Sequence, residues 1–76
     1  MKKKTIQYSS PVDALVALAK RLAICENGYR MDSEDFFARY TKGVLGDSEE
    51  FVEWANDYQH YVALRIDLEE RLKHAA

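Results

Sequence analysis

The stretch SEEFVEWANDYQHYVALRIDLEERLKH, residues 48–74, decides the fold, because neither glycine nor proline interrupts it. We expect one continuous helix here, beginning at Asp47 or Ser48. Glu49 and Glu50 then lie in its first turn, where the helix dipole favours negative charge. A helix of this length spans about 40 Å at 1.5 Å per residue. We expect it to be the dominant element of the protein.

This expected helix is amphipathic, but its apolar surface is broader than one core face requires. Leu64 and Ile66 lie on opposite flanks of the main apolar stripe, which widens it beyond the roughly 100° of a single face. Arg65 falls inside the stripe, where it can snorkel outward, pair with Glu69 or anchor an interface. The stripe consists of Phe51, Trp54, Ala55, Tyr58, Tyr61, Val62, Leu68 and Leu72.

A first helix is predicted to begin at Ser10, with Ser10 as N-cap, Pro11 at the first helical position and Asp13 as a first-turn carboxylate. It is expected to end at Gly28 or at Tyr29-Arg30. One face would carry Leu15, Leu18, Leu22, Cys25 and Tyr29, while Val16, Ala17 and Ile24 lie off that face.

A short second helix is predicted over residues 33–41. Asp32 fits the N-cap position and Asp35 the third helical position, and Met31 and Phe36 occupy the two positions of a hydrophobic staple. Gly43 and Gly46 punctuate the turn that follows.

The sequence therefore predicts an all-α fold: one domain over residues 10–76, in which a short middle helix separates a long first helix from a longer third helix. Residues 1–9 are expected to form a flexible or short extended N-terminal arm.

Charge is distributed unevenly although the net charge is only −2. Residues 1–31 carry six Lys or Arg against two Asp or Glu, whereas residues 32–76 carry five against eleven. An acidic half suits basic partners and disfavours nucleic acid. No stretch approaches the roughly 20 apolar residues of a membrane span, and no apolar region follows the initial lysines as in a secretory signal. We expect a cytoplasmic protein without a membrane association.

No constellation for catalysis is present, so we expect no enzymatic activity, no cofactor and no metal. Glu53, Asp57 and His60 share helical spacing, but a carboxylate metal site of this type needs similar groups from several helices. Cys25 is the only cysteine, which rules out an intrachain disulfide, and its place on the apolar face suggests a buried small residue.

The surplus apolar surface on two helices predicts a partner, because three helices offer little to cover it. That partner is either a second copy of the chain or a different protein. Coverage within one monomer, by the short helix and the arm, stays open as a third possibility. The basic residues Lys2–Lys4 and Lys20-Arg21 keep nucleic-acid binding as the least favoured alternative.

Three segments resemble a known group: Met31-Asp32-Ser33-Glu34-Asp35-Phe36-Phe37, then Gly43-Val44-Leu45-Gly46-Asp47, then Phe51-Val52-Glu53-Trp54-Ala55 with Tyr58. They are similar to small bacterial and archaeal proteins that share M-S-S-E-E-F, G-x-L-G-D and D-F-x-E-W-A motifs and look like antitoxins of type II toxin–antitoxin pairs. The resemblance covers about residues 29–72. It departs at Asp32, where serine is commoner, and at Val44, where glutamate is commoner.

The resemblance implies an antitoxin that wraps or plugs a toxin enzyme, commonly an RNase. The acidic segment from Asp47 to Asp57 suits a basic RNA-binding cleft, and buried aromatic residues are expected hot spots. A homo-oligomeric structural or adaptor protein without catalytic activity is the alternative. The expected partner-binding residues are Glu50, Trp54, Asp57, Tyr58, Tyr61, Leu64, Arg65, Ile66 and Leu68.

Overall fold

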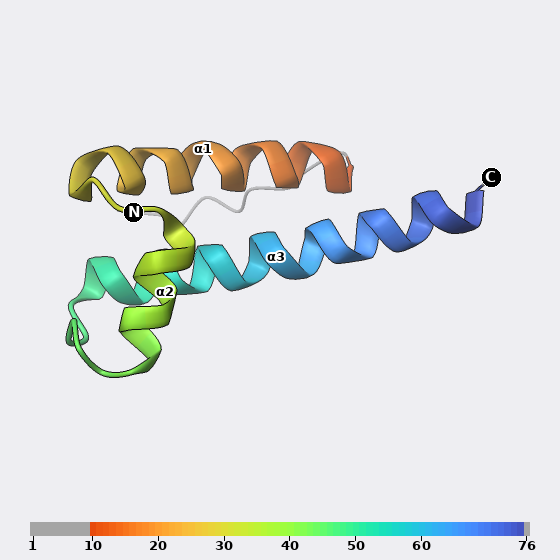
Figure 1. The fold of residues 1–76 in the computed structure, drawn as a ribbon. Helices are drawn as coiled ribbons and strands as arrows, with labels where there is room; N and C mark the ends of the chain where they lie inside the picture. Colours follow the sequence, from red (N-terminus) through yellow and green to blue (C-terminus); the bar gives the residue numbers. More distant parts are fainter. Residues whose placement is uncertain (1–9, 76) are drawn as a thin grey trace, which may run out of the picture.

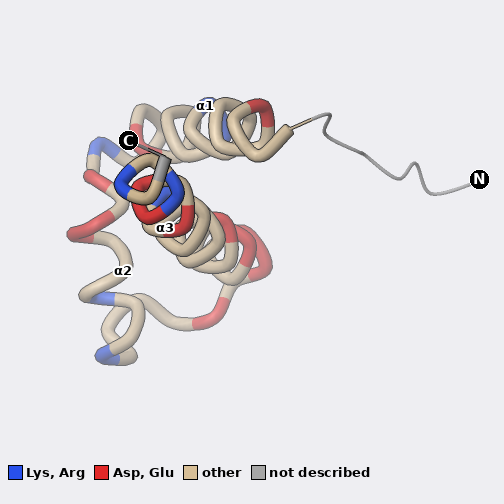
Figure 2. The backbone as a smooth tube through the Cα atoms, turned by 90° about the vertical axis from the view of Figure 1, so that its right-hand side faces the viewer, with Lys and Arg blue, Asp and Glu red and all other residues tan. Residues whose placement is uncertain are grey.

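The computed structural model describes residues 10–75 and contains three helices: α1 (Pro11–Tyr29), α2 (Ser33–Thr41) and α3 (Glu49–Ala75). This confirms the predicted all-α fold with a short middle helix. The two long helices run side by side, and α2 lies across the first half of α3 (Figure 1). Figure 2, which looks nearly along α3, shows α1 and α2 on different sides of it. The predicted N-terminal arm lies outside the described residues.

The start of α1 follows the predicted capping pattern. Ser10 is the N-cap, and its hydroxyl accepts a hydrogen bond of 3.2 Å from the backbone N–H of Asp13. The helix ends at Tyr29, and Arg30 adopts the left-handed conformation with φ 54°. Its backbone N–H donates to the carbonyl oxygen of Glu26, so the turn uses Arg30 rather than Gly28.

The start of α2 differs from the prediction in its capping group. Asp32 occupies the N-cap position, but its side chain makes no capping hydrogen bond. The carboxylate of Glu26, on α1, instead accepts a hydrogen bond of 2.9 Å from the backbone N–H of Ser33. One backbone N–H at the helix start, which has no partner within α2, thus bonds to a neighbouring helix, and this contact joins α2 to α1.

The turn between α2 and α3 depends on two glycines in the left-handed region, Gly43 with φ 78° and Gly46 with φ 81°. A side chain there would be strained. Ser48 then caps α3, because its hydroxyl accepts a hydrogen bond of 3.2 Å from the backbone N–H of Phe51.

The core lies where all three helices meet, at the first half of α3. Phe36 from α2 stacks on Trp54 with ring centroids 3.8 Å apart and planes 4° from parallel, and both side chains are buried. Met31 and Phe51 pack around this pair, so the predicted staple residues Met31 and Phe36 both reach the core. The buried apolar residues are Ala14, Leu18, Leu22, Phe36, Trp54 and Ala55.

The second half of α3 has no buried side chain within residues 56–74. Ile66 remains 54% exposed and Leu72 72% exposed, while Leu64 is half-buried. On α1, Ile24 is 71% exposed. Apolar side chains both beside the main stripes (Ile24, Ile66) and at the distal end of the α3 stripe (Leu72) are therefore open to solvent in a single copy. None of the helices within residues 10–75 combines the length and hydrophobicity of a membrane-crossing segment.

Candidate partner-binding surfaces

The residues predicted to bind a partner do not form one patch. Trp54 is only 1% exposed and belongs to the core. The others, apart from Leu64, lie on three surfaces, which we name the acidic hollow, the apolar groove and the distal seam. Glu50 and Asp57 lie in the hollow, Tyr58 and Ile66 in the groove, and Tyr61, Arg65 and Leu68 along the seam. Tyr58, Tyr61 and Arg65 also line a further hollow between the three helices, with Ala19, Leu22, Glu26, Ser33 and Glu34. Leu64 is half-buried, two turns after Asp57 on the same side of α3.

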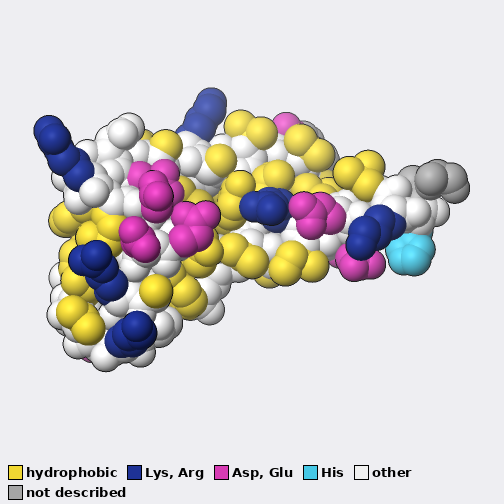
Figure 3. All heavy atoms as spheres, viewed as in Figure 1, with side chains coloured by type: hydrophobic (Ala, Val, Ile, Leu, Met, Phe, Trp, Pro, Cys, Tyr) yellow, Lys and Arg dark blue, Asp and Glu magenta, His cyan; other side chains and the backbone are white. Residues whose placement is uncertain are grey.

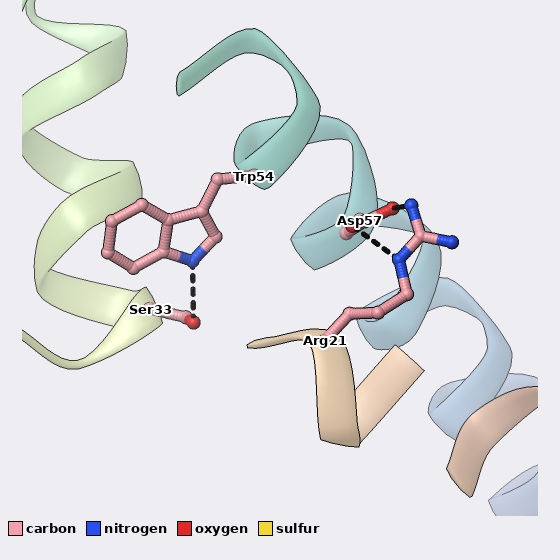
Figure 4. A network of polar contacts seen from close by, with 4 residues as sticks. All are labelled: Arg21, Ser33, Trp54 and Asp57. Atoms are coloured by element: carbon pink, nitrogen blue, oxygen red, sulfur yellow. Dashed lines mark hydrogen bonds and ion pairs between the residues drawn. The ribbon is translucent and has the colours of Figure 1, made fainter. Parts of the chain in front are cut away.

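The acidic hollow lies between α1 and α3, and an ion pair closes one side of it. The guanidinium of Arg21 makes two hydrogen bonds to the Asp57 carboxylate, at 3.0 and 3.1 Å (Figure 4). Arg21 is not among the residues expected from the sequence. The lining residues are Arg21, Ile24, Cys25, Glu50, Glu53, Trp54 and Asp57.

Glu50 also holds a side chain of α1. Its carboxylate accepts a hydrogen bond of 2.6 Å from the Tyr29 hydroxyl, and this bond raises the pKa of Tyr29. The Tyr29 ring lies 5.2 Å from the Phe51 ring and 5.6 Å from the Trp54 ring. The carboxylates of Glu50 and Asp57, both in the acidic segment of α3, thus each make a polar contact with a side chain of α1.

Ile24 and Glu53 are exposed side chains of the hollow for which no hydrogen bond or ion pair is seen within residues 10–75. Ile24 is 71% exposed at the rim, and Glu53 is an exposed carboxylate from the facing helix. Cys25 is half-buried beside them; burial, followed by the nearby Glu50 charge, raises the pKa of its thiol. A raised thiol pKa lowers the fraction of thiolate at a given pH.

Trp54 separates the hollow from the core, and one hydrogen bond fixes its indole. Its N–H donates to the Ser33 hydroxyl at 2.9 Å, and both side chains are buried (Figure 4). The sequence does not identify Ser33 as the acceptor. The sequence indicates only that a tryptophan on the apolar stripe, once buried, needs some hydrogen-bond acceptor for its indole N–H.

The apolar groove lies on the side of α3 that α2 covers in part. Phe37 from α2 packs against Tyr58, with ring centroids 5.2 Å apart, and this contact closes one end. Ile66 lines the groove and is 54% exposed. The groove is lined by Phe37, Tyr58, Gln59, Val62, Ala63 and Ile66.

The distal seam comprises Tyr61, Arg65, Leu68, Glu69 and Leu72 on the second half of α3. The spacing of Tyr61, Arg65, Leu68 and Leu72 alternates between four and three residues, which aligns them on one face. Arg65 pairs with Glu69 at 3.5 Å, and a hydrogen bond to Tyr61 together with this carboxylate raises the pKa of Arg65. Of the three roles open to Arg65, pairing with Glu69 is the one observed.

Figure 3 shows basic and acidic side chains among hydrophobic ones along the second half of α3. Leu68 is half-buried and Leu72 is 72% exposed. The seam is therefore an apolar surface with one opposite-charge pair in it.

Within the part of the chain that the structure describes, no group of three or more His, Cys, Asp or Glu side chains is arranged to hold a metal ion. Comparison of the chain with models of protein families, with curated proteins and with solved structures found no match.

Proposed function

We propose that this chain is an antitoxin-like cytoplasmic protein that binds and neutralises a partner toxin, an RNase in the form that the sequence resemblance implies. One observation carries the proposal: the acidic hollow presents Ile24, 71% exposed, next to the exposed carboxylate of Glu53. An apolar side chain set among carboxylates matches a partner surface that combines an apolar pocket with basic groups.

The hollow suits a partner surface that is basic and has a small apolar pocket. Ile24 would enter the pocket, and Glu53 would meet the basic side chains around it. Charge complementarity of this kind speeds and orients association more than it sets affinity. Because Glu50 and Asp57 already hold Tyr29 and Arg21, their first role is to keep the hollow in shape.

The test uses the product of the adjoining gene as the probe. That product is expressed alone and together with this chain, and growth and complex formation are measured. We expect growth arrest by the product alone, relief by this chain, and a purified complex of the two.

Two variants test the surface. Ile24→Glu and Glu53→Lys are expected to weaken the complex at least tenfold, since each removes a central contact of the interface. Val44→Glu is the control, because Val44 is 68% exposed in the turn before α3 and outside the hollow. A product that is neither toxic nor bound, or a complex unaffected by both variants, would overturn the proposal.

A homo-oligomeric structural or adaptor protein is the second candidate function. Two exposed side chains in the second half of α3 support it: Ile66 of the apolar groove is 54% exposed, and Leu72 of the distal seam is 72% exposed. A stable dimer that forms without any other protein, together with an inert neighbouring gene product, would favour this candidate over the first.

A further inference from the structure

We infer that two copies of this chain associate through the outer sides of their α1 helices, which run antiparallel and place Val16 of each copy against Ala19 of the other. The surface is the outer face of α1, which we define as Val12, Val16, Ala19 and Ala23. The inference is independent of toxin binding, and it gives the homo-oligomeric candidate a defined interface. It rests on the exposure of this face, on the spacing of its side chains and on the order of large and small residues along it.

The outer face is apolar and open to solvent. Helix α1 buries Leu18 and Leu22 on the side that packs against α3, whereas Val12 is 54% and Val16 48% exposed on the other side. The two alanines of the face are exposed as well, although Ala19 also borders the hollow between the three helices. In Figure 3, hydrophobic side chains line the outer side of α1. This helix is therefore apolar on two sides, and within residues 10–75 the chain covers one of them.

The spacing is that of a helix-pairing surface. Positions 12, 16, 19 and 23 repeat at intervals of four, three and four, as the inward positions of a coiled coil do. When a second α1 runs in the opposite direction, Val12 lies opposite Ala23 of the second copy, and Val16 lies opposite its Ala19. Each of these contacts occurs twice, with the roles of the copies exchanged, as a twofold interface requires.

The sizes of the side chains favour the antiparallel direction. Every contact then joins one valine and one alanine, so the two helices keep an even separation. A parallel copy would set valine against valine at one end and alanine against alanine at the other, which separates the helices unevenly. Lys20 and Asp13 flank the face on one side, and in the antiparallel pair each Lys20 lies near Asp13 of the other copy. The face is therefore complementary to itself in one orientation.

The interface is small, because α1 has only 19 residues. Since a stable complex usually buries at least about 1,200 Å² in total, one pair of short helices predicts association at the weak end of that class. We expect monomers in dilute solution and dimers in concentrated solution. The outer face shares no residue with the lining of the acidic hollow, so the two surfaces can be altered separately.

The first experiment measures the mass of the full chain by light scattering over a roughly hundredfold range of concentration, which covers the transition of a weak dimer. Val16→Glu is expected to keep the chain monomeric throughout. Val44→Glu is the matched control: it makes the same substitution at an exposed valine in the turn before α3, and it should leave the dimer intact. Circular dichroism of both variants checks that the helices are retained.

The second experiment exchanges the large and small residues. Val16→Ala alone sets alanine against alanine, and Ala19→Val alone sets valine against valine. Each should weaken the dimer about tenfold, because a twofold interface contains each change twice. The double variant V16A/A19V again joins one valine and one alanine in every contact, and its dimer should return to within about threefold of the original. A different protein on this face would not carry the compensating change, so the recovery identifies the second copy as the occupant.

The inference is overturned if the chain is monomeric at every concentration, if Val16→Glu leaves the dimer unchanged, or if the double exchange fails to restore it. A monomeric chain whose complex with the neighbouring gene product is lost in Val16→Glu would also overturn it, and would assign the outer face to that product. The growth assay with Ile24→Glu tests the acidic hollow separately. Failure of the dimer and failure of the toxin proposal are thus distinguishable.

Discussion

The buried hydroxyl of Ser33 accepts the indole N–H of Trp54 at 2.9 Å, and this bond joins the first turn of α2 to the middle of the core. The same residue is held from the other side, because its backbone N–H donates to the Glu26 carboxylate at 2.9 Å. Ser33 is therefore the point at which polar contacts connect all three helices.

Ser33→Ala should destabilise the protein by about 1–3 kcal/mol, because the indole N–H of Trp54 would remain buried without an acceptor. The free energy of unfolding, measured with urea and followed by far-UV circular dichroism, checks this. In a Trp54→Phe background the same substitution should cost much less. Equal costs in both backgrounds would show that the hydrogen bond is not the cause.

Glu26→Gln should destabilise the protein by about 1 kcal/mol, because a neutral amide is a weaker acceptor at the start of α2 than a carboxylate. Asp32→Asn is the control: it also neutralises one carboxylate near this helix start, but the Asp32 side chain makes no capping hydrogen bond. Thermal unfolding of both variants gives the comparison. A larger loss for Asp32→Asn would contradict the assignment of Glu26 as the cap.

Cys25 should react slowly with iodoacetamide at pH 8. Burial and the Glu50 charge raise the pKa of its thiol, so less thiolate is present than in an unfolded chain at the same pH. The rate should increase as the pH is raised further, and urea should increase it at constant pH. Mass spectrometry of the alkylated chain measures this. Equal rates in native buffer and in urea would refute the prediction.

Amide hydrogens beyond about residue 62 of α3 should exchange faster than those around Trp54, because local contacts with the core are fewest there. Exchange measured by mass spectrometry on dilute protein gives the gradient. Uniform protection along α3 would contradict the prediction.

Local sequence signals predicted the helices well. Ser10, Pro11 and Asp13 define the start of α1, and Gly43 and Gly46 mark the turn before α3. These signals act over a few residues, so they can be recognised without knowing how the helices pack. The staple between Met31 and Phe36 is local in the same way.

The contacts between helices could not be predicted in this manner. Glu26 caps α2 from another helix, and Arg21 pairs with Asp57 across 36 positions of sequence. Periodicity placed Trp54 on the apolar stripe, yet which stripe residues become buried depends on where α2 lies. Trp54 was therefore expected at a partner surface and is found in the core, whereas the exposed Ile24 was not among the expected partner-binding residues.

The interhelical polar contacts described above join residues 21, 26 and 29 of α1, 33 of α2, and 50, 54 and 57 of α3. All lie toward the end of the molecule where α1 turns into α2. At the opposite end, Ala14 and Leu18 are covered by apolar packing. The described polar contacts between helices are therefore concentrated at one end of the helix pair, and buried apolar side chains lie toward the other. A substitution at residue 21, 26, 33 or 57 thus acts on the same end of the molecule as the aromatic core.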